Sequence, residues 1–493
     1  MIRSATSFSA SLPDARRELA ARLLARSATA QKDHGGSIPK RESKGPAPLS
    51  HYQEQIYRHA QLAQEFAPGS LLYNETITFY RRGPLDVAAL EQSLTEIVRR
   101  HEAWRTNFKV VNGEVQQEIQ PLHPVTVKEV DLRGLPDGER ELAFAELGLQ
   151  DLRRPFDLAK DRLFRFCLIR MADEDFRLLL SAHQIILDGV SVYHVLLPEI
   201  AHLYAAYSAG GLSPLPEPSI QVADYACWQR EHLPPKFAGD LAFWKQQLGQ
   251  EPCRLSLPAD RPRPAVQTFR GAIQQFALSE TLAHDLRALA HAEGVTLFAA
   301  ALAGFVALLH SYTKQEDIVV GTLAPTREFS EVQRLLGYFL NPVVLRVDAS
   351  GNPTLRELML RTRDVVIKAL AHSSLPFHHL VDALQADRDR SSNPLYQVQF
   401  SLEPPMPESI AGWNLTPMDL ESGGAKLDLY VVLDERPNGI LGRAQYNPDL
   451  FEAPTVQRLV ERYSNVLQVL ASRTETRLHD VPQVNTTGSG ATV

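Results

Sequence analysis

The chain has 493 residues, 44% of them hydrophobic and 22% charged, and a formal net charge of −7. This length allows a large buried core and predicts two or three domains. The acidic balance gives no electrostatic reason to expect nucleic acid or an anionic membrane as a partner. No run of about 18 apolar residues predicts a membrane span. Cys167, Cys227 and Cys253 lack metal-ligand spacing, so we predict neither a disulfide framework nor a metal site, and a reducing cytoplasm fits best.

The two ends of the chain differ in composition from the rest. Residues 14–26 predict a short amphipathic helix capped by Asp14, followed by a polar linker that ends at residue 47. The first 31 residues are rich in Ser, Ala and Arg, so a mitochondrial transit peptide is an alternative. Residues 481–493 are small and polar, and we expect a disordered tail there.

Between these ends, helical and extended patterns alternate. Apolar residues recur at helical spacing over residues 85–98 and 355–370. Apolar runs of strand length occupy residues 164–169, 177–180, 317–320 and 343–347. Because helices and strands are mixed along the chain, the sequence predicts an α/β fold.

One segment places polar side chains at the end of an apolar run. His183 and Gln184 follow three leucines, and Asp188 and Gly189 come shortly after. Successive side chains of a strand point to opposite faces, so only one of His183 and Gln184 can face a cavity. The Asp-Gly pair is typical of a turn. Alone, a histidine at a strand end is more often a structural group than a catalyst.

Residues 183–189 resemble the HHxxxDG active-site motif of condensation domains from nonribosomal peptide synthetases. Gln184 stands where the family has its second histidine, the one at the reaction centre. Six further segments resemble the family's other motifs in the family's order: residues 48–57, 100–106, 223–229, 336–341, 372–377 and 388–400. The chain is therefore identified as a member of this family. Residues 73–75 and 82–86, with the HQ form of the motif, resemble condensation domains of hybrid polyketide–nonribosomal peptide systems.

The resemblance implies two chloramphenicol-acetyltransferase-like subdomains in a V arrangement with a central tunnel. We place the N-terminal subdomain, which carries the active-site motif, at residues 48–232 and the C-terminal one at residues 233–480. Residues 1–47 then form a segment that could dock to a carrier module.

The resemblance also implies roles for the site residues. Asp188 is expected to pair with Arg327 of the second subdomain, so that its loss would damage the fold. Gly189 is either part of a plain turn or supports a developing oxyanion through its N–H. Gln184 can orient a reactant but cannot take up a proton, and His183 faces the other way. The residues expected to hold loops and the subdomain interface are Asn341, Asp224, Trp228 and Asn393.

The implied activity is acyl transfer in the biosynthesis of antibiotics and other secondary metabolites. An acyl or peptidyl carrier protein would present a thioester on its phosphopantetheine arm, and an amine or alcohol would attack it. The domain needs no cofactor of its own. Since positioning contributes roughly 7–11 kcal/mol and a general base about 10²–10⁴-fold, losing the histidine need not abolish the reaction.

The sequence leaves alternatives open. We find no adenylation signature and no carrier attachment motif, so we expect a free-standing, monomeric acyltransferase that works on carriers of other proteins. A relative that has lost catalysis and acts as a docking platform for carrier proteins or tailoring enzymes is the second interpretation. Carrier-bound epimerisation ranks last, because removal of an α-proton depends still more on a base.

Overall fold

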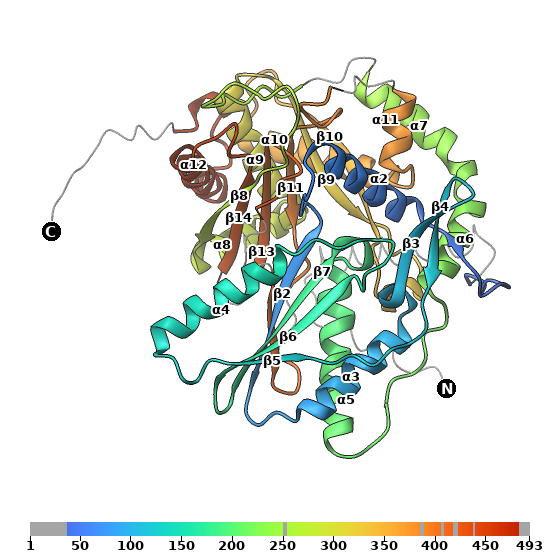
Figure 1. Ribbon diagram of the computed structural model, residues 1–493. Helices are drawn as coiled ribbons and strands as arrows, with labels where there is room; N and C mark the ends of the chain where they lie inside the picture. The colour runs from blue at the N-terminus through green and yellow to red at the C-terminus, as the bar shows by residue number, and fades with distance from the viewer. Residues whose placement is uncertain are drawn as a thin grey trace.

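The computed structural model describes residues 37–249, 254–384, 389–405, 409–417, 423–436 and 439–482. The predicted N-terminal helix, Cys253 and nearly all of the predicted tail lie outside these ranges. Helices and strands are mixed throughout the described chain, as the sequence predicted (Figure 1).

The N-terminal half contains one five-stranded mixed sheet, one small three-stranded sheet and the helices that flank them. Its strands are β1 (Ala47–Pro48), β2 (Asn74–Arg82), β3 (Thr106–Val111), β4 (Glu114–Ile119), β5 (Lys128–Asp131), β6 (Phe164–Ala172) and β7 (Asp175–His183). Its helices are α2 (His51–Phe66), α3 (Val87–Arg100), α4 (Asp137–Leu152), α5 (Leu197–Ser208) and α6 (Val222–His232), with the short turns η1 (Glu102–Arg105), η2 (Gln184–Ile186) and η3 (Ser191–Leu196).

The C-terminal half repeats the plan with a larger sheet. Its strands are β8 (Ala272–Leu278), β9 (Asp317–Pro325), β10 (Leu340–Asp348), β11 (Val398–Leu402), β12 (Trp413–Pro417), β13 (Leu429–Arg436) and β14 (Gly439–Tyr446). Its helices are α7 (Pro234–Leu248), α8 (Glu280–Ala292), α9 (Leu297–Thr313), α10 (Leu355–Ala371), α11 (Phe377–Ala383) and α12 (Ala453–Ser472), with the turns η4 (Val332–Arg334) and η5 (Leu478–Asp480).

Local sequence explains where these elements begin. The Asp86 side chain accepts a hydrogen bond from the Ala89 N–H (3.1 Å) and so starts α3. Thr354 and Glu357 form a reciprocal capping box at the start of α10. The predicted helices over 85–98 and 355–370 and the four predicted strands are confirmed, each within a few residues.

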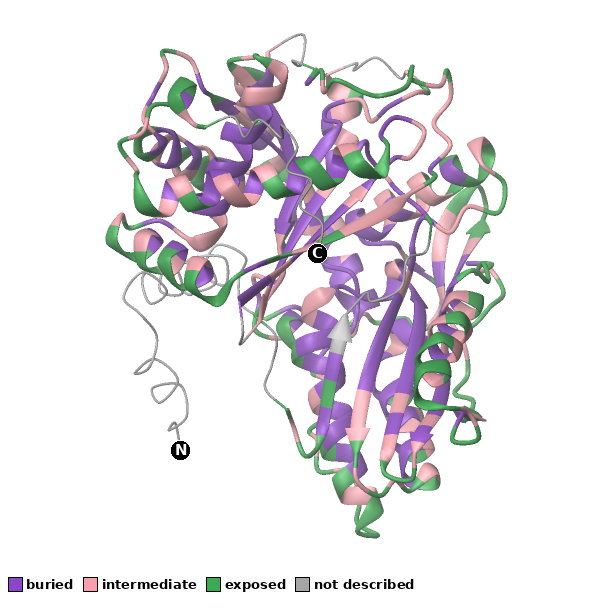
Figure 2. Cartoon of the chain, turned by 90° about the vertical axis from the view of Figure 1, so that its left-hand side faces the viewer, coloured by how far each residue is buried: buried purple, intermediate pink, exposed green. Residues whose placement is uncertain are grey.

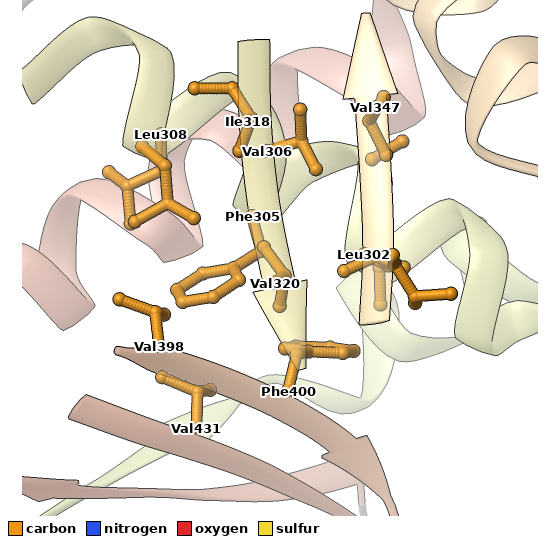
Figure 3. Close-up of a cluster of buried hydrophobic side chains, with 14 of the residues drawn as sticks. Leu302, Phe305, Val306, Leu308, Ile318, Val320, Val347, Val398, Phe400 and Val431 are labelled. Carbon is orange, nitrogen blue, oxygen red and sulfur yellow. The ribbon is translucent and has the colours of Figure 1, made fainter. Parts of the chain in front are cut away.

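The two large sheets are open. One has the strand order β12-β2-β7-β6-β5 and the other β10-β9-β11-β13-β14-β8, while β1, β4 and β3 form a small separate sheet. The strands are largely buried, whereas the outer faces of the helices are exposed (Figure 2). In the C-terminal half, α9 is apolar on all sides and buried against the sheet, where Phe305 stacks on Phe400 of β11 with ring centroids 5.4 Å apart (Figure 3).

Two segments of the C-terminal half belong to the core of the N-terminal half. Strand β12 pairs antiparallel with β2, opposing Trp413 to Arg81. The segment 329–339 places Phe329, Leu336 and Phe339 in the same hydrophobic cluster as β7 and α5. The division predicted at residue 232 coincides with the junction of α6 and α7, but the two halves share these segments and pack as interlocked units.

Among the described residues, no single helix is both long and apolar enough to cross a membrane. Helices α8 and α9 reach that length and hydropathy only as a pair, which is bent by 107°.

We predict that Trp413→Ala destabilises the protein by about 3–5 kcal/mol, because Trp413 is fully buried in the core of the other half. Urea unfolding measures the effect. The control is Leu142→Ala on α4, where the side chain is 72% exposed and the expected change is within about 0.5 kcal/mol. Equal effects of the two substitutions would contradict the structural importance of β12.

Candidate functional site

The active-site motif begins where β7 ends. Strand β7 runs to His183, and Gln184 starts the short turn η2, with its backbone N–H bonded to the Tyr73 carbonyl (2.8 Å). His183 and Gln184 leave this point toward different cavities: Gln184 lines the larger one and His183 lines a separate, smaller one. The two side chains are thus divided as the alternation of a strand requires.

His183 is a buried, neutral imidazole. Its Nδ1 accepts a hydrogen bond from the Ile185 N–H (3.2 Å), and its ring lies 5.7 Å from that of Tyr73. Burial, together with the nearby Lys426 cation, lowers the pKa of His183 to about 3. His183 is thus a weak proton acceptor and lies outside the lining of the larger cavity.

The larger cavity has a volume of about 530 Å³ and lies between the two halves. Strand β2, helix α2 and the motif form one wall, and β11, β13, β14 and α11 form the other. Its polar lining includes Gln184, Glu75, Tyr73, His59, Glu403, Lys426, Tyr430 and Arg443. The site is therefore complete only when both halves are present.

Gln184 is bonded to a cation from the opposite half. Lys426 Nζ donates to Gln184 Oε1 (2.6 Å) and lies 4.2 Å from the centre of the Tyr73 ring. Burial lowers the pKa of Lys426 to about 8, against the opposing influence of Glu75. Because Lys426 takes the amide oxygen, the Gln184 NH₂ group, which donates to no described residue, is left to the cavity.

Gly189 does not have the backbone angles of the plain turn that was one of its two expected roles. The sequence suggested a turn residue with special backbone angles, but Gly189 has no positive φ and opens the helical segment that continues into η3 and α5. A Cβ added at Gly189 would lie 2.8 Å from Glu403 Oε2. The Glu403 carboxyl group therefore lies close to Gly189, and a larger residue at position 189 would have to displace this side chain.

Two of the carboxyl groups that line the cavity have raised pKa values. Burial raises the pKa of Glu403 to about 7, opposed by Arg443 and supported by Asp434, Glu75 and Asp188. Burial also raises the pKa of Glu75, while Lys426 and Arg443 oppose that rise. The sequence analysis missed Glu75, Glu403 and Lys426. The sequence does show charged residues at or near the ends of apolar strands. It does not show which of these strands lie next to one another in the fold.

Asp188 and Arg327 form a buried ion pair between the halves. Arg327 Nη2 lies 2.9 Å from Asp188 Oδ1, and Arg327 Nη1 donates to the carbonyls of Val332 (2.7 Å) and Leu335 (2.9 Å). Asp188 also accepts from the N–H groups of Ser191 (2.7 Å) and Phe339 (3.0 Å). Both charges are fully hydrogen-bonded. Arg327, Val332 and Leu335 do not line the cavity.

The remaining predicted residues support loops. Asn341 Nδ2 donates to the carbonyls of Ser373 (2.9 Å) and Leu375 (2.7 Å). Asp224 caps α6, and Trp228 packs edge-on against Phe329. None of Asn341, Asp224 and Trp228 lines the cavity, whereas Asn393 does.

Three histidines meet at the α2–α11 contact. A ligand nitrogen of each of His51, His378 and His379 lies within 4.8 Å of the others. Neither nitrogen of His51 or of His378 has a hydrogen-bond partner in the described part of the chain. Burial lowers the pKa values of His51 to about 3 and His378 to about 4, so both are neutral, as metal ligands must be. This group has the geometry to hold a metal ion, and the spacing of single residues along the sequence did not indicate it.

The model of a family described as "Condensation domain" matches residues 43–489. A linear gramicidin synthase protein of Brevibacillus parabrevis is 39% identical over 451 residues, which cover 90% of this chain and 9% of that protein. The chain thus spans a small part of that relative.

Solved structures share the fold. The X-domain of teicoplanin biosynthesis, solved in complex with OxyB, has a TM-score of 0.76 at 26% identity and covers 90% of this chain and 97% of that one. The SgcC5 protein of Streptomyces globisporus, solved with a naphthyl ethanediol and sucrose, has a TM-score of 0.74 at 27% identity and covers 87% and 100%. The fold is therefore the predicted two-part α/β architecture.

We predict that Asp188→Ala lowers the free energy of unfolding by about 3–5 kcal/mol, because Arg327 would stay buried without its counter-charge. Chemical denaturation measures this. Asp173→Ala removes an ion pair with Arg133 in which the Asp173 side chain is 82% exposed, and it should cost at most about 1 kcal/mol. An unchanged stability in Asp188→Ala would assign the pair a role other than holding the halves together.

Proposed function

The chain belongs to the condensation-domain family, and from this premise we propose that it is an acyltransferase that forms an amide or ester from a carrier-bound thioester. The observation that carries the proposal is the cavity between the halves, in which Gln184 and Gly189 of one half face Lys426 and Glu403 of the other. An apolar space with a few converging polar groups is the usual form of a site for an acyl chain.

We further propose that the donor is an acyl, polyketide or peptidyl chain on the phosphopantetheine arm of an acyl or peptidyl carrier protein. The domain would act on carrier-bound thioesters in secondary-metabolite biosynthesis, without a cofactor of its own. The acceptor is an amine or an alcohol, and the diol bound to the similar SgcC5 structure supports including alcohols.

Gln184 would act as a hydrogen-bond donor in this reaction. Its oxygen is engaged by Lys426, so the side that it presents to a reactant is the NH₂ group. A donor is suited to the oxygen of the thioester carbonyl, which becomes negative as the nucleophile attacks. This refines the role expected from the sequence, where either end of the amide could have faced the reactants.

Gly189 would supply a second donor to the same oxygen. Asp188 caps the helical segment that Gly189 opens, and its carboxylate bonds to the Ser191 N–H. The Gly189 N–H donates to no group among the described residues, and it stands at the positive end of that segment on the cavity wall.

A docking platform is the second candidate. The similar X-domain is solved in complex with OxyB, and Gln184 lacks the titratable ring of the family's histidine. A platform would bind a carrier protein or tailoring enzyme and leave the thioester intact.

The experiment incubates the purified protein with acyl-loaded carrier proteins and a panel of amines and alcohols. Intact-protein mass spectrometry follows the acyl mass on the carrier. Enzyme-dependent loss, with appearance of the matching amide or ester, supports the transferase. Retention of the acyl group on carriers that bind the protein supports the platform.

We predict that Gln184→Ala lowers kcat/KM by no more than about 10²-fold, because other donors to the oxyanion stay in place. Gln184→Glu keeps the bond to Lys426 but lacks the N–H donors, so it should lose at least as much as alanine. Gln184→His should be tolerated or faster, because it adds a base. Steady-state kinetics measure all three, with the exposed Gln150→Ala on α4 as an unaffected control. Full activity in Gln184→Glu would contradict the donor role.

A further inference from the structure

We propose that Glu403 is the general base of the transfer and takes the proton that the attacking amine must lose, a step for which the Gln184 amide has no chemistry. This inference rests on the proposed acyl transfer and assigns its proton acceptor. It places that acceptor on the C-terminal half, opposite the motif.

The backbone of Glu403 is fixed by a hydrogen bond to β13, and its side chain lies close to Gly189. Glu403 directly follows β11, and its N–H donates to the Leu433 carbonyl (2.8 Å), which continues the pairing of β11 with β13. Its Oε2 would lie 2.8 Å from a Cβ added at position 189. The carboxyl group therefore lies close to Gly189, the residue whose N–H is proposed to bind the thioester oxygen.

The Glu403 carboxyl group is also free to accept a proton. It takes part in no hydrogen bond with another described side chain, and it lines the cavity. The charged and titratable groups that face it from the elements around it are Arg443, Asp434, Glu75, Asp188, Tyr193 and Tyr430. Burial among them raises its pKa to about 7, and a base is most effective near the pH at which it works.

Three other titratable side chains of the cavity, Lys426, His59 and Glu75, are less suited to the step. Lys426, with a pKa of about 8, is mostly cationic at neutral pH and already bonded to Gln184. His59 is bonded to the Tyr73 hydroxyl (2.6 Å), and burial lowers its pKa to about 4. Two cations, Lys426 and Arg443, favour the ionised form of Glu75, and Glu75 is not among the atoms close to Gly189.

The proton and electron transfers of this step need only the amine, the thioester and Glu403. The amine nitrogen attacks the thioester carbon, the C–N bond forms, and Glu403 accepts the proton that nitrogen releases. As the C–S bond breaks, the electron pair stays on sulfur, and protonated Glu403 returns the proton to that thiolate. The products are the amide and the free thiol of the carrier arm, and Glu403 is again ionised.

The test measures kcat/KM against pH with an acyl-loaded carrier and an aromatic amine, which stays unprotonated over the range in which Glu403 titrates. Four proteins are compared: the wild type, Glu403→Gln, Glu75→Gln and the double variant Gln184→His/Glu403→Gln. Glutamine keeps the shape of the carboxyl group, and Glu75→Gln is the matched change at a second glutamate of the cavity.

For the wild type, we expect kcat/KM to fall as the pH drops below about 7, because Glu403 becomes protonated. Glu403→Gln should lose about 10²–10⁴-fold and lose this pH dependence. The double variant should recover at least about tenfold, because it returns a titratable base to the motif. Glu75→Gln should keep the wild-type pH profile.

Thermal unfolding at two pH values separates this role from a folding defect. The pKa of Glu403 is raised in the folded protein, so its ionisation destabilises the fold as the pH rises above the unfolded-state pKa. Glu403→Gln should therefore melt higher than the wild type in alkaline buffer and at the same temperature in acid.

Wild-type transfer with an unchanged rate and pH profile in Glu403→Gln would overturn this inference and leave the proposed function standing. Loss of the pH dependence in Glu75→Gln instead would move the base to β2 and also overturn it. A wild type that transfers to no acceptor would overturn the function and the base together.

Discussion

The buried ion pair between Asp188 and Arg327 joins the two halves of the molecule. Asp188 caps the helical segment that begins at Gly189, while Arg327 holds the carbonyls of the segment that reaches into the N-terminal core. Removing water from two charges is costly, and here each charge recovers that cost through several hydrogen bonds. The pair therefore links the motif to the segment that carries Arg327.

The segments of the C-terminal half that pack in the N-terminal half also join the two halves. Strand β12 extends the N-terminal sheet, so the chain must cross between halves after β11 and again before β13. Glu403 lies in the first of these crossings and Lys426 in the second, which explains why both reach the motif. The two crossings that join the halves therefore also bring Glu403 and Lys426 to the motif.

The proposed division of labour follows from electrostatics. Lys426 holds the Gln184 oxygen and turns the amide into a donor, while Gly189 exposes a second N–H to the same space. Glu403 has the raised pKa of a carboxylic acid buried away from a bonding partner. A site arranged in this way stabilises negative charge on one side and accepts a proton on the other, without a histidine at its centre.

By itself, the sequence determined the family, the α/β class and the elements that local patterns encode. Apolar periodicity predicted α3, α10 and the main strands, and motif order predicted that Asp188 and Arg327 would meet, because such signals depend on neighbours or on a whole ordered set of motifs. Strand alternation also separated His183 from Gln184, since it is a property of one strand.

Only the tertiary structure decided what surrounds Gln184 and Gly189. Lys426 lies 242 residues from Gln184 in the chain, and Glu403, which follows β11, lies close to Gly189. No local pattern encodes a contact of that range, because it depends on the path of the chain between the halves and on burial in the assembled cavity. The same burial sets the pKa of Glu403, so the chemistry of the site is a property of the folded protein.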